Sequence, residues 1–294
     1  MPTNPPHRNE SQTPEDTADP GPVLLLCSGQ RSGSTLLQRI VSSGPDLWVW
    51  GEPGPGILGL RDADLAMRAL SDYRSREAAA EVGPAGPPGF IAVVLPPAET
   101  YRSAARAWFD TAFADAPRGG AGARWGFKEV RLGHSFAEWF VDLYPRARVV
   151  HLVRHPLDVL RSLLSWEEQV TRWTPDLTAE AMGNWLTVVD SFHTAGADPP
   201  WLLRLSYEEL ASVRADGAEG AGRADAVDAL EEHLGLAAGS LDRAVLNQRI
   251  HRPGAVGRTP RAMPGAEEVA RRFAAMATRD RVREHAERLG YRVP

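Results

Sequence analysis

Short apolar segments alternate along this chain with longer stretches in which apolar residues recur at helical spacing. The apolar segments have the length of buried β-strands, and glycine, proline or polar residues bound most of them. They cover residues 23–27, 46–53, 124–130, 148–154 and 201–205. Because these segments alternate with helical stretches, the pattern predicts an α/β fold with a parallel, doubly wound sheet.

The helical stretches fill the intervals between these strands. They are predicted at 34–43, 63–80, 98–114, 134–144, 156–169, 178–195, 225–234, 240–249 and 266–288, with a short helix beginning at 206–210. The interval 54–117 has two open interpretations: an insertion that covers the substrate, or plain helical packing. Residues 1–20 are polar and proline-rich, which predicts a disordered tail ahead of one folded domain at 21–294.

A loop of small residues joins the first strand to the first helix. Gly29 and Gly33 let the backbone approach a ligand closely, and Ser32, Ser34 and Thr35 carry hydroxyl groups. A strand, a glycine loop and a helix N-terminus form an anion site, because free backbone N–H groups and the helix dipole favour negative charge. The sequence therefore predicts a phosphate or phosphosulfate cradle, and an ordinary strand-to-helix turn with a polar cap is the alternative.

This loop differs from the GxxxxGK[ST] pattern of nucleoside-triphosphate sites. The spacing from Gly29 to Gly33 is one residue short, and Ser34 stands where that pattern has its lysine. The sequence also has no good second acidic motif for magnesium. These differences argue against a P-loop kinase of a small metabolite, which stays the alternative function.

The amino-acid composition excludes or disfavours several further classes of protein. The net charge of -5 gives no argument for a nucleic-acid partner, and the single cysteine, Cys27, allows neither an intrachain disulfide nor a cysteine metal cluster. A buried strand thiol is its expected role. No apolar run reaches the roughly 18 residues of a membrane span and no signal peptide is evident, so a cytoplasmic enzyme is expected. Lys128 is the only lysine in an arginine-rich chain, which hints at a role that arginine cannot fill.

Charged residues stand where predicted strands end. Glu52 closes the segment 46–53, and in a parallel sheet its carboxylate would lie beside the glycine loop. A solvated glutamate is the alternative. Arg154 ends another strand, and Ser162 lies two turns into the helix that follows it. A guanidinium and a hydroxyl so spaced can bind one phosphate, although an unrelated pair is the simpler explanation when they are taken alone.

Four segments, taken in order, resemble one family. RSGSTLL at 31–37, GEP at 51–53, WGFKEVR at 125–131 and HLVRHPLDVLRSLL at 151–164 are similar to sulfotransferases that use 3′-phosphoadenosine 5′-phosphosulfate. The resemblance is to the group with bacterial carbohydrate and tyrosylprotein sulfotransferases, and it spans residues 23–210. It implies a P-loop-like three-layer fold, with a central parallel sheet and helical insertions covering the site, and a reaction that needs no metal.

The resemblance also implies roles for individual residues. Glu52 matches the carboxylate proposed as general base, and Lys128 matches the lysine that stabilises the bridging oxygen. The residues matched to donor binding are Arg31, Ser32, Gly33, Ser34 and Thr35 for the 5′-phosphosulfate, Arg154 and Ser162 for the 3′-phosphate, and Tyr207 near the adenine. Two interpretations are open for Arg252 and Arg258 in the C-terminal basic loop: closure over the 3′-phosphate, or a solvated loop.

The chain departs from one branch of this family. Cytosolic aryl and steroid sulfotransferases carry a catalytic histidine two residues after the corresponding lysine, where this chain has Val130. The difference favours Glu52 as the base, with Glu129 and His134 as weaker candidates.

The sequence thus predicts in-line transfer of a sulfuryl group to a hydroxyl of a small-molecule, natural-product or glycan acceptor. A non-catalytic nucleotide-binding module is a third possibility, and the presence of both Glu52 and Lys128 argues against it. Trp50, Trp166 and Trp173 lie near predicted edges of the site and are candidates to line an acceptor pocket, although core packing explains them equally well. The oligomeric state is not readable from the sequence.

Overall fold

The computed structural model describes residues 20–78, 95–117, 123–170, 172–193, 197–212, 226–248 and 263–293. The tail predicted at 1–20 lies outside these residues except for Pro20, and so does the basic loop with Arg252 and Arg258. Across the described residues, no helix combines the length and the apolar character that a transmembrane segment needs.

A central sheet of five parallel strands organises the fold. The strands are Val23–Cys27 (β1), Leu47–Trp50 (β2), Arg124–Glu129 (β3), Arg148–Val153 (β4) and Leu202–Ser206 (β5). Their order is β2-β3-β1-β4-β5, and every neighbouring pair is parallel. The predicted α/β fold with a central parallel sheet is therefore confirmed.

Strand β1 lies at the centre of this sheet, and all its residues are buried. Its side chains alternate between the two faces, with Leu25 and Cys27 in one apolar cluster and Leu24 and Leu26 in the other. After β1 the chain moves to one side of the sheet, and after β4 it moves to the other. The carboxyl ends of these two neighbours therefore form a topological switch point, the place where open α/β sheets bind ligands.

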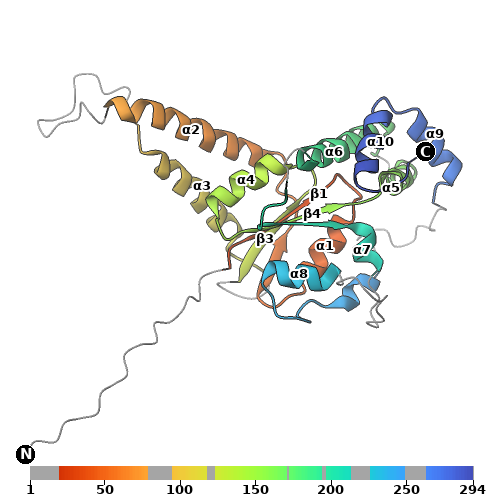
Figure 1. Ribbon diagram of the computed structural model, residues 1–294, viewed down its shortest axis with the longest axis horizontal. Helices are drawn as coiled ribbons and strands as arrows, with labels where there is room; N and C mark the ends of the chain where they lie inside the picture. The colour runs from red at the N-terminus through yellow and green to blue at the C-terminus, as the bar shows by residue number, and fades with distance from the viewer. Residues whose placement is uncertain are drawn as a thin grey trace, which may run out of the picture.

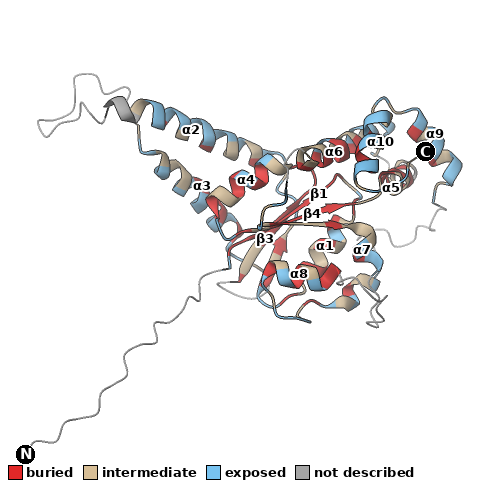
Figure 2. Cartoon of the chain, in the orientation of Figure 1, coloured by how far each residue is buried: buried red, intermediate tan, exposed pale blue. Residues whose placement is uncertain are grey.

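Helices cover both faces of the sheet and give a three-layer architecture (Figure 1). Ser34–Val41 (α1), Tyr207–Ser212 (α7), Ala226–Leu234 (α8) and the 3₁₀ turn Arg243–Asn247 (η1) pack on one face. Ala98–Phe113 (α3), His134–Leu143 (α4) and Pro175–His193 (α6) pack on the other. Pro156–Gln169 (α5), Ala266–Ala274 (α9) and Arg279–Arg288 (α10) form a third apolar cluster with α6. Figure 2 shows the buried residues gathered on the strands and on the inner sides of these helices.

The interval between β2 and β3 contains two helices that lie side by side, Gly56–Ala78 (α2) and α3. In Figure 1 they extend away from the sheet as an arm. Phe109 anchors α3 to the sheet, because its ring stacks on Phe127 of β3 with 5.9 Å between centroids. The predicted helical insertion is present, although α2 begins earlier than residue 63. Glycine lowers helix propensity without forbidding a helix, so Gly56 and Gly59 stand in its first turns.

Two predicted helices differ from the structure. The single helix expected at 266–288 is two helices, because the chain turns after Ala274 so that Met276 packs into the third cluster and α10 returns against α6. The helix expected near 240–249 is only the short turn η1. The side chain of Asp242 begins that turn by accepting a hydrogen bond from the Ala244 N–H.

Candidate functional site

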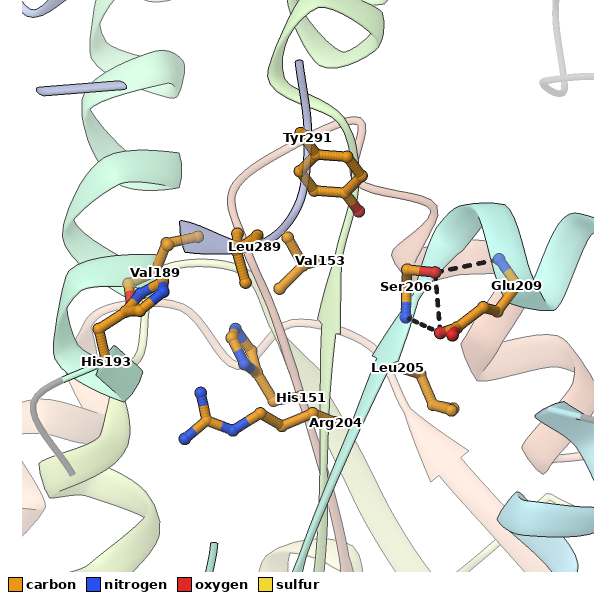
Figure 3. Close-up of a pocket in the computed structure, with 10 residues that line it drawn as sticks. All are labelled: His151, Val153, Val189, His193, Arg204, Leu205, Ser206, Glu209, Leu289 and Tyr291. Atoms are coloured by element: carbon orange, nitrogen blue, oxygen red, sulfur yellow. Dashed lines mark hydrogen bonds between the residues drawn. The ribbon is translucent and has the colours of Figure 1, made fainter. Parts of the chain in front are cut away.

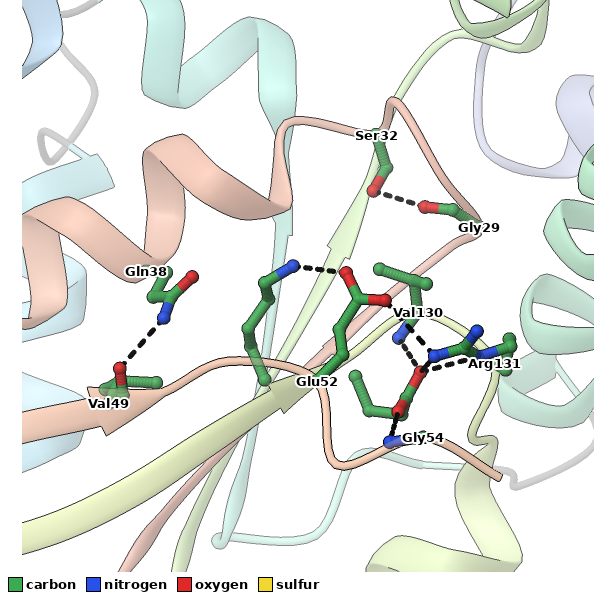
Figure 4. Close-up of polar contacts among 10 residues, drawn as sticks. Gly29, Ser32, Gln38, Val49, Glu52, Gly54, Val130 and Arg131 are labelled. Carbon is green, nitrogen blue, oxygen red and sulfur yellow. Dashed lines mark hydrogen bonds and ion pairs between the residues drawn. The ribbon is translucent and has the colours of Figure 1, made fainter. Parts of the chain in front are cut away.

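The loop after β1 closes on itself at the switch point. The N–H of Ser28 donates to a carbonyl of β4 at 2.9 Å, which ties the start of the loop to the neighbouring strand. Ser32 is fully buried and donates its hydroxyl to the Gly29 carbonyl at 2.8 Å (Figure 4). Gly29, Arg31 and Gly33 have φ angles of 73°, 64° and 97°. The loop is therefore a tight turn that uses the left-handed region at both predicted glycines.

Helix α1 begins directly after this loop. Gly33 occupies the N-cap position, and no side chain caps the helix. The N–H groups of Leu36 and Leu37 bond to the Gly33 carbonyl, whereas those of Ser34 and Thr35 precede the first intrahelical bonds. An uncapped N-terminus that follows a glycine loop suits an anion, as the sequence predicts.

Two arginines come together beside the loop. Arg31 donates from Nε to the Ser162 hydroxyl at 2.8 Å, and its guanidinium lies 4.5 Å from the centre of the Trp166 ring. Arg154 donates from Nη1 to the Arg31 carbonyl at 3.0 Å. Its Nε is buried and has no hydrogen-bond acceptor among the residues that the structure describes. The structure thus gathers two guanidinium groups and leaves a buried N–H for an anion such as a phosphate.

A capping box places Tyr207 beside the same loop. The hydroxyl and N–H of Ser206 donate to Glu209 Oε2 at 2.8 and 3.0 Å, and the Glu209 N–H contacts the Ser206 hydroxyl at 3.1 Å (Figure 3). This reciprocal bonding starts α7 at Tyr207. The Tyr207 ring lies 4.3 Å from the Arg154 guanidinium carbon and so close to Gly33 that a Cβ there would overlap it.

A cavity of about 150 Å³ lies next to this capping box, between β4, β5, α6 and the C-terminal segment (Figure 3). His151, His193 and Arg204 are in its wall, together with Tyr291, whose hydroxyl donates to Glu208 at 2.8 Å. No residue that lines the cavity is one of the predicted site residues. The cavity is therefore a neighbour of the candidate site and not a part of it.

An ammonium and a carboxylate meet where β2 and β3 end. Lys128 Nζ forms an ion pair with Glu52 Oε1, and Arg131 Nη2 lies 3.1 Å from Glu52 Oε2 (Figure 4). The Lys128 side chain is 9% exposed and that of Glu52 is 34% exposed. The structure thus brings the predicted base and the only lysine into direct contact, and it adds a second cation that sequence reasoning did not assign. Arg131 is the last residue of WGFKEVR at 125–131, one of the four segments that resemble the family, and this position was the only sign of a role in the sequence.

The two weaker candidates for the base make other contacts, and within the described residues neither forms an ion pair with the lysine. Glu129 is fully buried, and its carboxylate accepts two backbone N–H groups from the surrounding loops at 2.8 and 3.0 Å. His134 begins α4, and its ring packs against Phe192 and Trp201 on one face of the sheet. Glu52 is the candidate that combines partial exposure with a contact to the lysine.

The three tryptophans proposed for an acceptor pocket occupy two different environments. Trp166 and Trp173 pack edge to face with 5.0 Å between ring centroids, and Trp166 faces Arg31. Trp50 instead donates from Nε1 to the Phe113 carbonyl at 3.2 Å and packs against the apolar cluster of α3 and α4. Core packing therefore accounts for Trp50, whereas Trp166 lies beside the loop.

Two titratable groups lie buried under the site. Cys27 is the buried strand thiol that the sequence predicts, and burial raises its pKa to about 12. His151, which sequence reasoning did not assign, lies 3.0 Å from the Ser28 hydroxyl and stacks on Phe192. Burial lowers the pKa of His151 to about 3. Both side chains are therefore uncharged at neutral pH.

Comparison with known proteins identifies the class. A family model described as the sulfotransferase family matches residues 22–219, well over half of the chain. The protein is thus a transferase whose family chemistry is sulfuryl transfer. The chain belongs to the sulfotransferase family. No curated protein matches it.

The solved structures that match this chain include three described as sulfotransferases or sulfotransferase domains. The sulfotransferase domain of the Synechococcus PCC 7002 olefin synthase is 18% identical, with 97% of this chain and 100% of that chain covered and a TM-score of 0.45. The sulfotransferase domain of the curacin biosynthetic pathway is 14% identical, with coverages of 93% and 99% and a TM-score of 0.49. Mouse SULT7A1, solved with PAP, is 12% identical, with coverages of 75% and 61% and a TM-score of 0.39. At these values the likeness carries no argument about this chain.

Proposed function

We propose that the protein transfers the sulfuryl group of 3′-phosphoadenosine 5′-phosphosulfate to a hydroxyl of a small-molecule, natural-product or glycan acceptor, in line and without a metal. The observation that carries this proposal is the contact between Lys128 and Glu52 at the sheet edge that also bears the loop after β1. In a chain of the sulfotransferase family, this pair supplies a proton acceptor and a compact cation.

The proposed reaction forms one S–O bond and breaks another. The acceptor oxygen attacks the sulfur, and the proton of its hydroxyl passes to the Glu52 carboxylate. The bond from sulfur to the bridging oxygen breaks, and its electron pair leaves with 3′-phosphoadenosine 5′-phosphate. The Lys128 ammonium stabilises the negative charge that develops on that oxygen.

The remaining site residues would bind the donor. The loop 32–35 and Arg31 hold the 5′-phosphosulfate, Arg154 and Ser162 hold the 3′-phosphate, and Tyr207 lies near the adenine. The buried Nε of Arg154, which lacks an acceptor within the described part of the chain, supports phosphate binding at this end. The tight loop and the uncapped start of α1 support anion binding at the other.

A transfer assay tests this proposal. Purified protein is incubated with the donor and a panel of hydroxyl acceptors in the presence of EDTA, and release of 3′-phosphoadenosine 5′-phosphate is measured. We expect turnover, and we expect Glu52→Gln and Lys128→Met to lower kcat by about 10²- to 10⁴-fold, the range for lost proton transfer and charge stabilisation.

Binding measurements supply the control. The product nucleotide should bind both variants in calorimetry nearly as well as it binds the wild type. Glu284→Gln, which changes an exposed ion pair with Arg288 on α10, should leave kcat unchanged. A wild-type protein that does not bind the nucleotide would contradict the proposal, and magnesium-dependent binding of ATP instead would favour a kinase.

A further inference from the structure

Arg131 contacts two carboxylates at once. Its Nη2 lies 3.1 Å from Glu52 Oε2 and 2.9 Å from Glu129 Oε1, and its Nε lies 2.9 Å from the same Glu129 oxygen. The Arg131 side chain is 31% exposed, whereas that of Glu129 is 0% exposed. Arg131 therefore joins a carboxylate at the mouth of the site to one in the protein interior (Figure 4).

Glu129 is itself held from two sides. It accepts the Gly54 N–H at 3.0 Å and the Val130 N–H at 2.8 Å. Gly54 follows Glu52 in the loop after β2, and Val130 precedes Arg131 in the loop after β3. A buried carboxylate with two N–H donors and a guanidinium is well compensated and has little freedom to move. Glu129 thus holds the Arg131 guanidinium and also bonds to the loop after β2, which carries Glu52, and to the loop after β3, which carries Arg131.

The other cation on Glu52 is Lys128, and in the proposed reaction its ammonium also has to act on the donor. If Lys128 acts on the bridging oxygen of the donor, its ammonium is shared between that oxygen and Glu52 Oε1, and its hold on the carboxylate weakens. The contact from Arg131 to Oε2 does not involve the donor. We infer that Arg131 is the positioning residue for Glu52: anchored on Glu129, it keeps the carboxylate in place when Lys128 turns to the donor. This inference rests on the proposed function.

Variants of Arg131 test the inference, with Arg68 as a matched control. Arg68 Nη1 also bridges a buried and a partly exposed carboxylate, Asp64 at 3.2 Å and Asp142 at 2.8 Å, but on the arm α2. For Arg131→Gln we expect kcat to fall about 10- to 100-fold, because a displacement of about 1 Å in a reacting group can have that effect. The dissociation constant of the product nucleotide should stay within about threefold of the wild-type value, since Arg131 is ion-paired with Glu52 and Glu129, neither of which is proposed to bind the nucleotide.

The conservative variant separates positioning from general stability. Arg131→Lys should recover part of kcat, because one ammonium can contact a carboxylate but cannot bridge two as a guanidinium fork does. Arg68→Gln should keep the wild-type kcat while losing a comparable amount of thermal stability. Melting temperatures are recorded for all three variants. If Arg131→Gln is too unstable to assay, Arg131→Lys decides: a lower kcat at an unchanged melting temperature supports the inference, and a wild-type kcat overturns it.

The outcomes that overturn the inference differ from those that overturn the function. A wild-type protein that neither binds the nucleotide nor transfers sulfuryl groups contradicts the proposed function, and the role of Arg131 falls with it. With an active wild type, a kcat for Arg131→Gln equal to that of Arg68→Gln overturns the inference. A nucleotide affinity that weakens as much as kcat also overturns it, because Arg131 would then bind the donor.

Discussion

Replacing Gly33 by alanine tests whether the contact between the loop and Tyr207 shapes the nucleotide site. Gly33 has a φ of 97°, and the left-handed conformation costs a residue with a Cβ about 1–2 kcal/mol. The added Cβ would overlap Tyr207 Cδ2 and lie 2.7 Å from Cε2, and the Arg154 guanidinium carbon lies 4.3 Å from the centre of the same ring. Forcing the ring off its rotamer adds roughly 0.5–1.5 kcal/mol. If the loop shifts to relieve this strain and has to be restored when the nucleotide binds, a total of about 1.5–3.5 kcal/mol corresponds to a roughly 10- to 300-fold loss of nucleotide affinity.

Calorimetric titration with 3′-phosphoadenosine 5′-phosphate measures this loss. Gly183→Ala is the control, because a Cβ there meets nothing within 4 Å and alanine favours a helix by about 1 kcal/mol over glycine. Its nucleotide affinity should equal that of the wild type. Adding Tyr207→Ala to Gly33→Ala removes the ring that the new Cβ strikes, so the double variant should bind better than the sum of the single losses indicates. Wild-type affinity in Gly33→Ala would refute the reasoning.

Two buried groups give further predictions. The pKa of His151 is lowered from its ordinary value of about 6.5 to about 3 in the native protein. Between these two pH values the unfolded chain binds a proton at His151 and the native chain does not. The free energy of unfolding should therefore fall as the pH drops from about 6.5 to about 3. Urea titrations should show a shallower fall for His151→Gln, and equal slopes would contradict this. Because the pKa of Cys27 is raised to about 12, Ellman's reagent should modify it only as fast as the protein unfolds; rapid reaction with the native protein would show that the thiol is accessible.

The centre of the sheet was predictable from the sequence because β1 and β4 are buried on both faces. A parallel strand covered by helices is a near-continuous apolar run; Val23–Cys27 has this pattern, and Arg148–Val153 has it apart from Arg148 and His151. The break between α9 and α10 was not predictable in this way. Apolar residues recur at helical spacing both before the break (Val269, Phe273, Met276) and after it (Val282, Ala286, Leu289), and the turn depends on Met276 reaching a cluster formed by helices that are distant in the sequence.

The same contrast holds within the candidate site. Glu52 and Lys128 both stand at the ends of predicted parallel strands, so their meeting at one edge of the sheet follows from the topology. The contact of Gly33 with Tyr207 joins residues far apart in the sequence, and the bridge from Arg131 to Glu129 depends on side-chain directions within a loop. No hydrophobic pattern encodes such contacts, so they require the structure.

The order of the strands explains how one loop can serve both ends of the proposed donor. β3 and β4 flank β1, so the lysine of β3 lies on one side of the loop and Arg154, which follows β4, lies on the other. A donor with its sulfuryl group near Lys128 and its 3′-phosphate near Arg154 would therefore lie across the end of β1. Glu52 comes from β2, on the far side of β3 from β1. If Glu52 is the base, as proposed, the acceptor hydroxyl has to come within hydrogen-bond reach of its carboxylate, which points to an approach from the side of β2, where α2 begins.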